Sequence, residues 1–297
     1  TGLRIEETCS NCGVPQIRIN GLEGQYTQIL MDSRPIFSSL ASVYGLEQLP
    51  TGMVDRIEVI RGGGSALFGA NAIAGVVNII TKEPTRNFFN INQSNAFTQS
   101  GSYDINTSIN GSVVSENQKA GIYLFGVQRN RQQYDRDDDG FSDIPHINST
   151  TVGFRSFFKT SDYSKLVAEY HHTTEFRRGG YGIDSLQPHE SLLCEQLKHN
   201  IDAATLKWDY YSHDNKHFLS TYGSFQNINR DSYFGTHCNP NAYGKSHDIV
   251  SVLGAQYRFS YPCGAMESNL STGLEYSYNQ LRDQILGYDR NTLQRVH

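Results

Sequence analysis

Apolar and polar residues alternate with a period of two through most of the chain, from Arg86 onward. Residues 204–210 read ATLKWDY and residues 270–278 read LSTGLEYSY, so the apolar side chains of each segment share one face. This alternation is typical of β-strands whose two faces meet different surroundings. Several segments, such as 249–261, exceed the ~5–6 residues of an average strand and reach the ~9–11 residues that cross a bilayer. Their length favours an antiparallel membrane β-barrel over a soluble sandwich.

Short and long connections alternate between these segments. Bacterial barrels have short periplasmic turns and long extracellular loops, so we expect the long connections to face outward. The pattern gives about nine strands, the last near residues 266–283, and we therefore expect the chain to be incomplete at both ends. The short connections are 115–118, 160–162, 212–215 and 262–265, and the long ones are 132–146, 177–198 and 231–247.

The first part of the chain has a different pattern. Three short apolar runs, 29–31, 57–60 and 76–80, are separated by Gly-rich turns, and residues 40–51 suggest a short helix before a proline. We predict a small α/β domain over residues 1–85, enclosed by the first part of a barrel over residues 86–297.

Composition excludes several classes of protein. The 297 residues carry a net charge of −5, which gives no electrostatic basis for a nucleic-acid partner. No apolar run approaches the ~18–20 residues of a transmembrane helix. The glycines after Arg61 lack the frame of a phosphate-binding loop. The sequence contains no recognisable nucleophile–base constellation, so we do not expect an enzyme.

Two segments carry a family resemblance. IRINGLEGQYTQILMDSRPI, followed by LEQLPTGMVDRIEVIRGGGSALFGANAIAGVVNIITKEP, closely resembles the plug domain of TonB-dependent outer-membrane transporters. Three positions depart from the family pattern: Asn20–Gly21 replaces Arg–Gly, Ser33 replaces the Gly after Asp32, and Gly63–Gly64 lies where a Pro is usual.

The resemblance implies a bacterial outer-membrane barrel of ~22 strands when complete, with the plug in its lumen. It implies import of a scarce, bulky small-molecule substrate, energised through the TonB protein, in contact with outer-membrane lipids. The TonB-binding box is not found in this sequence. Cobalamin is the first substrate expected, with haem or a ferric siderophore as alternatives. A surface lipoprotein could capture substrate, and a surface receptor or adhesin without transport is the alternative of another class.

The resemblance also indicates which residues contact substrate. Two plug segments are expected at the apex of the plug, and two outer-loop residues could contribute; a solvent-facing turn is the alternative for the plug segments. These candidates are Leu22, Glu23, Gln25, Tyr26, Phe37, Ser38, Ser39, Ser42, Tyr44, Arg178 and Tyr181. Below the apex, Arg56, Glu58 and Arg61 could pair with charges on the barrel wall, the candidates there being Lys165, Glu169, Lys207 and Arg258.

An acidic loop suggests a calcium site. Its four candidate ligands, at positions 1, 3, 5 and 9 of the loop, are Asp135, Asp137, Asp139 and Asp143, and Gly140 would permit the sharp turn at position 6. Position 12 is His146, so a further carboxylate, from Asp104 or Asp184, would be needed. Some cobalamin transporters of the family carry calcium-ordered loops. The alternative is a solvated acidic loop without a metal.

The five cysteines suggest two disulfides. Cys9 and Cys12 form a C-x-x-C motif that lacks a second ligand pair for zinc and the strand–helix setting of a redox site, so a local disulfide is expected. Cys194 and Cys238 lie in adjacent predicted outer loops, and a disulfide between them would stiffen both.

Overall fold

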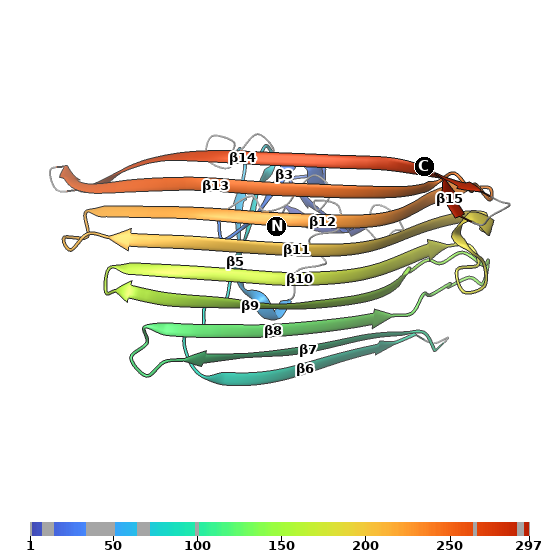
Figure 1. Ribbon diagram of the computed structural model, residues 1–297, viewed down its shortest axis with the longest axis horizontal. Helices are drawn as coiled ribbons and strands as arrows, with labels where there is room; N and C mark the ends of the chain where they lie inside the picture. Colours follow the sequence, from blue (N-terminus) through green and yellow to red (C-terminus); the bar gives the residue numbers. More distant parts are fainter. Residues whose placement is uncertain are drawn as a thin grey trace.

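The computed structural model describes residues 2–7, 15–33, 51–63, 72–98, 101–263, 266–289 and 294–296. Most of them belong to one antiparallel sheet in which each strand pairs with the next along the chain (Figure 1). The strands lengthen along the sequence, from 10 residues in β6 to 24 in β14. Their bounds are β6 Phe88–Phe97, β7 Tyr103–Val114, β8 Ala120–Arg131, β9 His146–Ser161, β10 Ser164–Gly180, β11 Leu193–Tyr211, β12 His217–Thr236, β13 Tyr243–Cys263, β14 Met266–Asp289 and β15 Gln294–Val296.

The two faces of this sheet differ in the way that the alternation predicts. Leu206, Leu253 and Leu274 point away from the interior and are highly exposed, Leu274 to 81%. Their sequence neighbours face the opposite side. An exposed apolar outer face over strands of this length is what a lipid-facing barrel wall requires.

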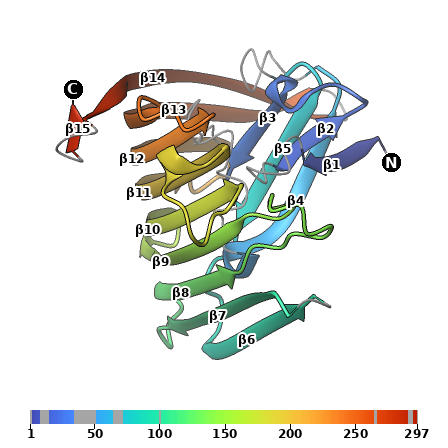
Figure 2. The ribbon, with the colours of Figure 1, turned by 90° about the vertical axis from the view of Figure 1, so that its right-hand side faces the viewer.

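A smaller domain lies on the concave side of the sheet (Figure 2). Its three-stranded sheet has the order β3–β5–β4, with β3 Thr27–Met31 parallel and β4 Val54–Arg61 antiparallel to β5 Gly75–Thr81. A second pair consists of β1 Leu3–Glu7 and β2 Pro15–Ile19. The buried residues Ile17, Ile19, Ala74 and Val77 join the two sheets into one core. This domain therefore occupies the lumen as a plug.

The described elements agree with the predicted fold class. The long strands β6 to β14 are the nine expected, and the last of them covers the segment predicted near 266–283. The predicted domain boundary after residue 85 falls between β5 and β6. Of the helix predicted over 40–51, residues 40–50 lie outside the described residues, and Thr51 begins a 3-10 turn. The short 3-10 turns η1 Gly24–Tyr26, η2 Thr51–Met53 and η3 Pro188–Glu190 complete the description, and none of the helices described could span a membrane.

Gly75 holds the central strand of the plug close to β4. A Cβ atom added there would lie 2.3 Å from the Ile60 carbonyl oxygen. We expect Gly75→Ala to destabilise the plug by about 1–3 kcal/mol, the usual cost of overpacking. Denaturant unfolding measured from the plug would detect the loss, and Gly63→Ala is the matched control because nothing lies within 4 Å of its added Cβ. Equal stability of the two variants would contradict the prediction.

Candidate functional site

The parallel strands β3 and β5 end together against the barrel wall. β3 runs into Asp32 and Ser33, both in the left-handed backbone region, at φ 48° and 66°. Asp32 turns back toward β5, where its carboxylate accepts hydrogen bonds from the Thr81 N–H at 3.0 Å and the Thr81 hydroxyl at 2.7 Å. The Asn78 side chain accepts a hydrogen bond from the Ser33 N–H at 2.8 Å and donates one to the Ser33 hydroxyl oxygen at 3.0 Å. These local bonds fix one carboxylate of the plug at its border with the wall.

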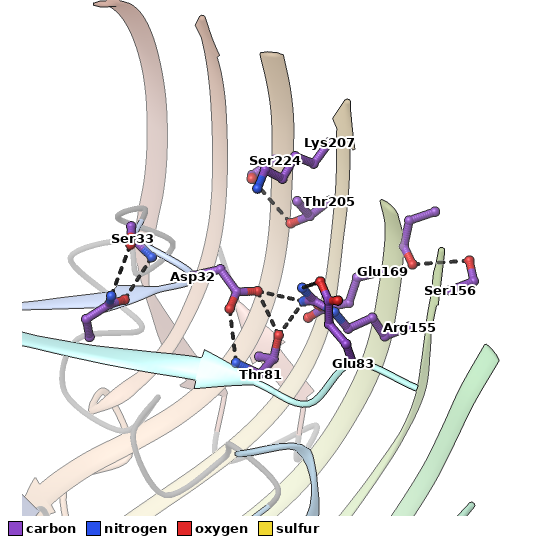
Figure 3. A network of polar contacts seen from close by, with 12 residues as sticks. Asp32, Ser33, Thr81, Glu83, Arg155, Ser156, Glu169, Thr205, Lys207 and Ser224 are labelled. Atoms are coloured by element: carbon purple, nitrogen blue, oxygen red, sulfur yellow. Dashed lines mark hydrogen bonds and ion pairs between the residues drawn. The ribbon is translucent and has the colours of Figure 1, made fainter. Parts of the chain in front are cut away.

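Arg155 of β9 meets this carboxylate from the wall side (Figure 3). Its Nη1 lies 2.6 Å from Asp32 of the plug and 2.6 Å from Glu169 of the neighbouring strand β10. It also donates to the Thr81 hydroxyl. Arg155 and Glu169 are buried, with 8% and 7% exposed. One guanidinium therefore joins two carboxylates, one from each domain.

A second ion pair lies beside the first. Lys165 of β10 contacts Glu83, two residues after β5, with 2.5 Å between Nζ and Oε2. The Arg155 Nη2 lies 3.8 Å from the other oxygen of Glu83. We call Asp32, Thr81, Glu83, Arg155, Lys165 and Glu169 the plug–wall network. A cavity of about 500 Å³ borders it and is also lined by Ser33, Asp55, Arg56, Thr205 and Lys207. Water therefore has room next to the ion pairs.

An apolar contact also joins the two domains. Met31 and Met53 of the plug pack against Tyr123 and Phe125 of β8. The Tyr123 hydroxyl donates to the Gly52 carbonyl oxygen at 2.5 Å. Within the described part of the chain, both an apolar cluster and a charged network therefore join the plug to the wall.

The predicted plug–wall contacts are only partly correct. Lys165 and Glu169 do belong to the interface, but their partners are Glu83 and Arg155. Arg56 instead pairs within the plug, with Glu58 at 2.9 Å and Asp55 at 3.1 Å, because these exposed side chains are sequence neighbours. On the wall, Lys207 pairs with Asp209 and Arg258 lies over the Phe218 ring. Sequence analysis missed Arg155, Asp32, Thr81 and Glu83.

The predicted substrate contacts are scattered over described and undescribed parts of the chain. Leu22 and Tyr26 are exposed on the turn between β2 and β3, near Glu23. The side chain of Gln25 and the residues Phe37, Ser38, Ser39, Ser42 and Tyr44 lie outside the described part. Arg178, near the end of strand β10, donates to the Leu186 carbonyl oxygen, and in the loop that follows the Tyr181 ring packs on Phe141, with 5.0 Å between the ring centroids. These two side chains hold loops together in this structure.

The acidic loop brings three of its four candidate ligands together. Carboxylate oxygens of Asp135, Asp137 and Asp143 all lie within 4.8 Å of one another, whereas Asp139 is outside that group and accepts a hydrogen bond from the Phe141 N–H. Asp104 pairs with Arg129, and Asp184 accepts a bond from Gln133, so both expected extra ligands are engaged elsewhere.

Backbone donors surround Asp135. The Asp138 and Gly140 N–H groups each donate to it at 2.8 Å. Partial burial raises the pKa of this carboxyl, but hydrogen bonds from these and neighbouring N–H groups outweigh that effect and leave the pKa below its ordinary value. The loop thus presents ionised oxygens of the kind that a hard cation prefers.

The predicted disulfide between Cys194 and Cys238 is wrong in this structure, where both thiols are free. Cys194 belongs to strand β11, where it packs against Tyr233 and Tyr243. The Cys238 thiol donates to the Glu190 carbonyl oxygen at 3.2 Å. Each sulfur is therefore occupied by a different contact. Cys9 and Cys12 lie outside the described residues.

A sheet of long antiparallel strands, apolar outside and curved around a small domain, defines a plugged barrel of the outer membrane. Residues 1–76 match the model of the TonB-dependent receptor plug domain. This part of the chain is therefore similar to the plug of the TonB-dependent receptors, as the sequence resemblance predicts.

Individual relatives carry different names. The chain is 41% identical over 80 residues to the ferric enterobactin receptor PirA of Pseudomonas aeruginosa, covering 24% of this chain and 11% of that protein. It is 25% identical over 183 residues to the vitamin B12 transporter BtuB of Photobacterium profundum, covering 60% of this chain and 29% of that protein. These relatives are receptors and transporters, in agreement with the expectation that the chain is not an enzyme.

Solved structures share the fold. The siderophore receptor PirA from Acinetobacter baumannii superposes with a TM-score of 0.76 at 16% identity, covering 96% of this chain and 45% of that chain. The ferric citrate transporter FecA has a TM-score of 0.72, with 97% of this chain and 44% of that chain covered. The chain therefore spans less than half the length of these proteins.

Proposed function

We propose that the complete protein imports a bulky nutrient across the outer membrane, driven through TonB. The observation that carries this proposal is the plug–wall network. A plug that must yield needs contacts that can break and re-form, and ion pairs beside a water-accessible cavity can exchange their partners for water. An entirely apolar contact would have no such replacement.

The substrate class that we propose is a metal chelate. The names of the relatives refer to vitamin B12 and to ferric enterobactin, which are both bulky metal complexes. The calcium-type loop favours cobalamin, whereas the higher identity over the plug favours a ferric siderophore. We therefore treat the two chelates as competing proposals of equal standing. Haem is a third proposed substrate, and only the histidines in the outer loops support it.

Uptake assays separate these proposals. Cells that lack the receptor gene, complemented with the full-length protein or with an empty vector, would be given labelled cobalamin, a labelled ferric catecholate or haem. We expect uptake of one of them to require both the receptor and TonB. Binding without TonB-dependent uptake would overturn the transport proposal and favour a surface receptor or adhesin. Tyr26→Ala in the same assay, expected to raise the KM, tests the proposed substrate contact at the plug apex.

We also propose that Ca²⁺ orders the loop containing Asp135, Asp137 and Asp143, with Asp139 as a weaker contributor. The clustering of three carboxylates supports this proposal, because like charges at this spacing repel one another without a cation. A surface lipoprotein that captures substrate is a further proposed partner. Its co-purification with the full-length receptor, and its loss when the outer loops are shortened, would test that idea.

A further inference from the structure

A small cavity lies between the inner face of the wall and Met31 of the plug. One row of that face joins His171 of β10, Ala203 of β11 and Gln226 of β12, which are paired in register. Because Ala203 has a short side chain, it leaves space between its two longer neighbours. The cavity has a volume of about 20 Å³, and these three wall residues and Met31 are among those that line it.

The two long side chains beside the cavity carry polar atoms that need a partner. His171 and Gln226 are both buried, each with 8% exposed. The His171 Nδ1 and the Gln226 Oε1 have no hydrogen-bond partner among the described residues. A buried polar atom without a partner is costly, and folded proteins almost always supply one, either from the protein or from an ordered water. The cavity between the two side chains is the place where a shared partner fits.

The size and the lining of the cavity fit one water molecule. A cavity needs about 10–15 Å³ to hold a water, and a buried water makes ~2–4 hydrogen bonds to polar groups. We propose that the cavity binds a single water, which accepts a hydrogen bond from the His171 Nδ1–H and donates one to the Gln226 Oε1. The imidazole is then the tautomer that carries its proton on Nδ1.

Water can reach this site from the larger cavity beside the plug–wall network. Glu169 and Thr205, an in-register pair on β10 and β11, line both cavities (Figure 3). The polar atoms of His171 and Gln226 are therefore satisfied in two states: by the bound water when the plug is seated, and by bulk water when it is displaced. This consequence rests on the proposed transport, whereas the water site itself does not.

The test displaces the water with a larger side chain. Ala203→Val adds two methyl groups inside the cavity, so His171 and Gln226 lose their shared partner and the plug seats over them less favourably. In the full-length protein in detergent, we expect the backbone amides of β3, which ends at Met31, to exchange with deuterium faster by a factor on the order of ten. Ala168→Val, the same change on the outer face of β10, is the matched control and should exchange as the wild type does.

A second background separates loss of the water from simple crowding. In a protein with His171→Leu and Gln226→Leu, both polar atoms that need the water are gone. Adding Ala203→Val there fills a dry cavity, so we expect exchange in β3 to be unchanged or slower. Equal acceleration by Ala203→Val in both backgrounds would overturn the proposal.

A crystal structure of the full-length protein gives the direct readout. We expect electron density for one water within ~3 Å of both the His171 Nδ1 and the Gln226 Oε1. A cavity without such density, or a direct hydrogen bond between the two side chains, would also overturn the proposal. Neither readout involves uptake, so failure of the transport proposal would leave this one standing.

Discussion

Arg155→Ala should loosen the plug and make the outer membrane permeable to large antibiotics. The substitution leaves Glu169 buried without its cation and removes the bond from the wall to Asp32. Breaking a buried ion pair in this way typically costs about 3–5 kcal/mol, most of it from the charge left behind. We expect the plug to unfold at lower denaturant concentration and substrate uptake to fall. Sensitivity of cells to an antibiotic too large for ordinary porins is the measurement.

Two further variants make this prediction specific. Arg155→Lys keeps the charge but replaces the guanidinium Nη1, which contacts Asp32, Thr81 and Glu169, by a shorter ammonium group, so we expect only partial recovery. Arg155→Met with Glu169→Gln removes both buried charges, and it should be more stable than Arg155→Ala alone. Lys159→Ala, at the exposed end of the same strand, is the control. If cells with Arg155→Ala resist the antibiotic and take up substrate as well as cells with the wild type, the network does not hold the plug.

Calcium should protect the acidic loop from proteolysis, and Asp135→Asn should abolish that protection. A cation present at a hundred times its Kd stabilises the bound form by about 2.7 kcal/mol, which is ample to suppress local opening. Asp139→Asn should have a smaller effect, because its carboxylate lies outside the group formed by Asp135, Asp137 and Asp143. Calorimetric titration of the full-length protein with CaCl₂ measures calcium binding by each variant, and limited proteolysis measures the protection of the loop.

The pH dependence follows from Asp135. Its pKa is lowered in the folded loop, so the bonds from backbone N–H groups contribute stability above the ordinary aspartate value near 3.8 and lose it as pH falls further. Loop protection should therefore persist from neutral pH to about pH 5. If a protease cleaves the loop equally fast with CaCl₂ and with a chelator at pH 7, the calcium proposal is wrong and the loop is a solvated acidic loop without a metal.

The sequence was sufficient to predict the barrel strands because their signal is local. A lipid-facing side chain and a lumen-facing one must alternate, so residues such as Leu206 and Lys207 reveal the two faces without knowledge of any partner. The plug strands β3, β4 and β5 were equally visible as apolar runs separated by Gly-rich turns, whereas β1 and β2 were not predicted. The resemblance of residues 17–36 and 46–84 to a known plug then identified the N-terminal domain as the one enclosed by the barrel.

The plug–wall network could not be predicted in this way. Asp32 and Arg155 are separated by 123 positions, and their contact depends on the seating of the plug against β9 and β10. At Arg56, two acids that are close in the sequence compete successfully for the guanidinium, so its predicted contact with the wall is not formed. One usable signal was Ser33, a departure from the family glycine, since its left-handed backbone marks the turn that positions Asp32.

The disulfide prediction failed for a related reason. Adjacent loops place two cysteines in one neighbourhood, but a bond also requires their Cβ atoms to face each other at about 4 Å. Cys194 is the second residue of β11 rather than part of a loop, so its side-chain direction is set by the pleat of the sheet. Sequence spacing does not contain that direction.

The cavity beside Arg155 also bears on how quickly the plug can separate from the wall. Two surfaces that part across a dry contact must open a void before water can enter, and that void is a kinetic barrier. Here the cavity leaves room for water beside the ion pairs, so each pair can lengthen through a water-bridged stage without a void. The rate at which the plug separates from the wall should then rise with ionic strength, because mobile ions screen the charges of these ion pairs.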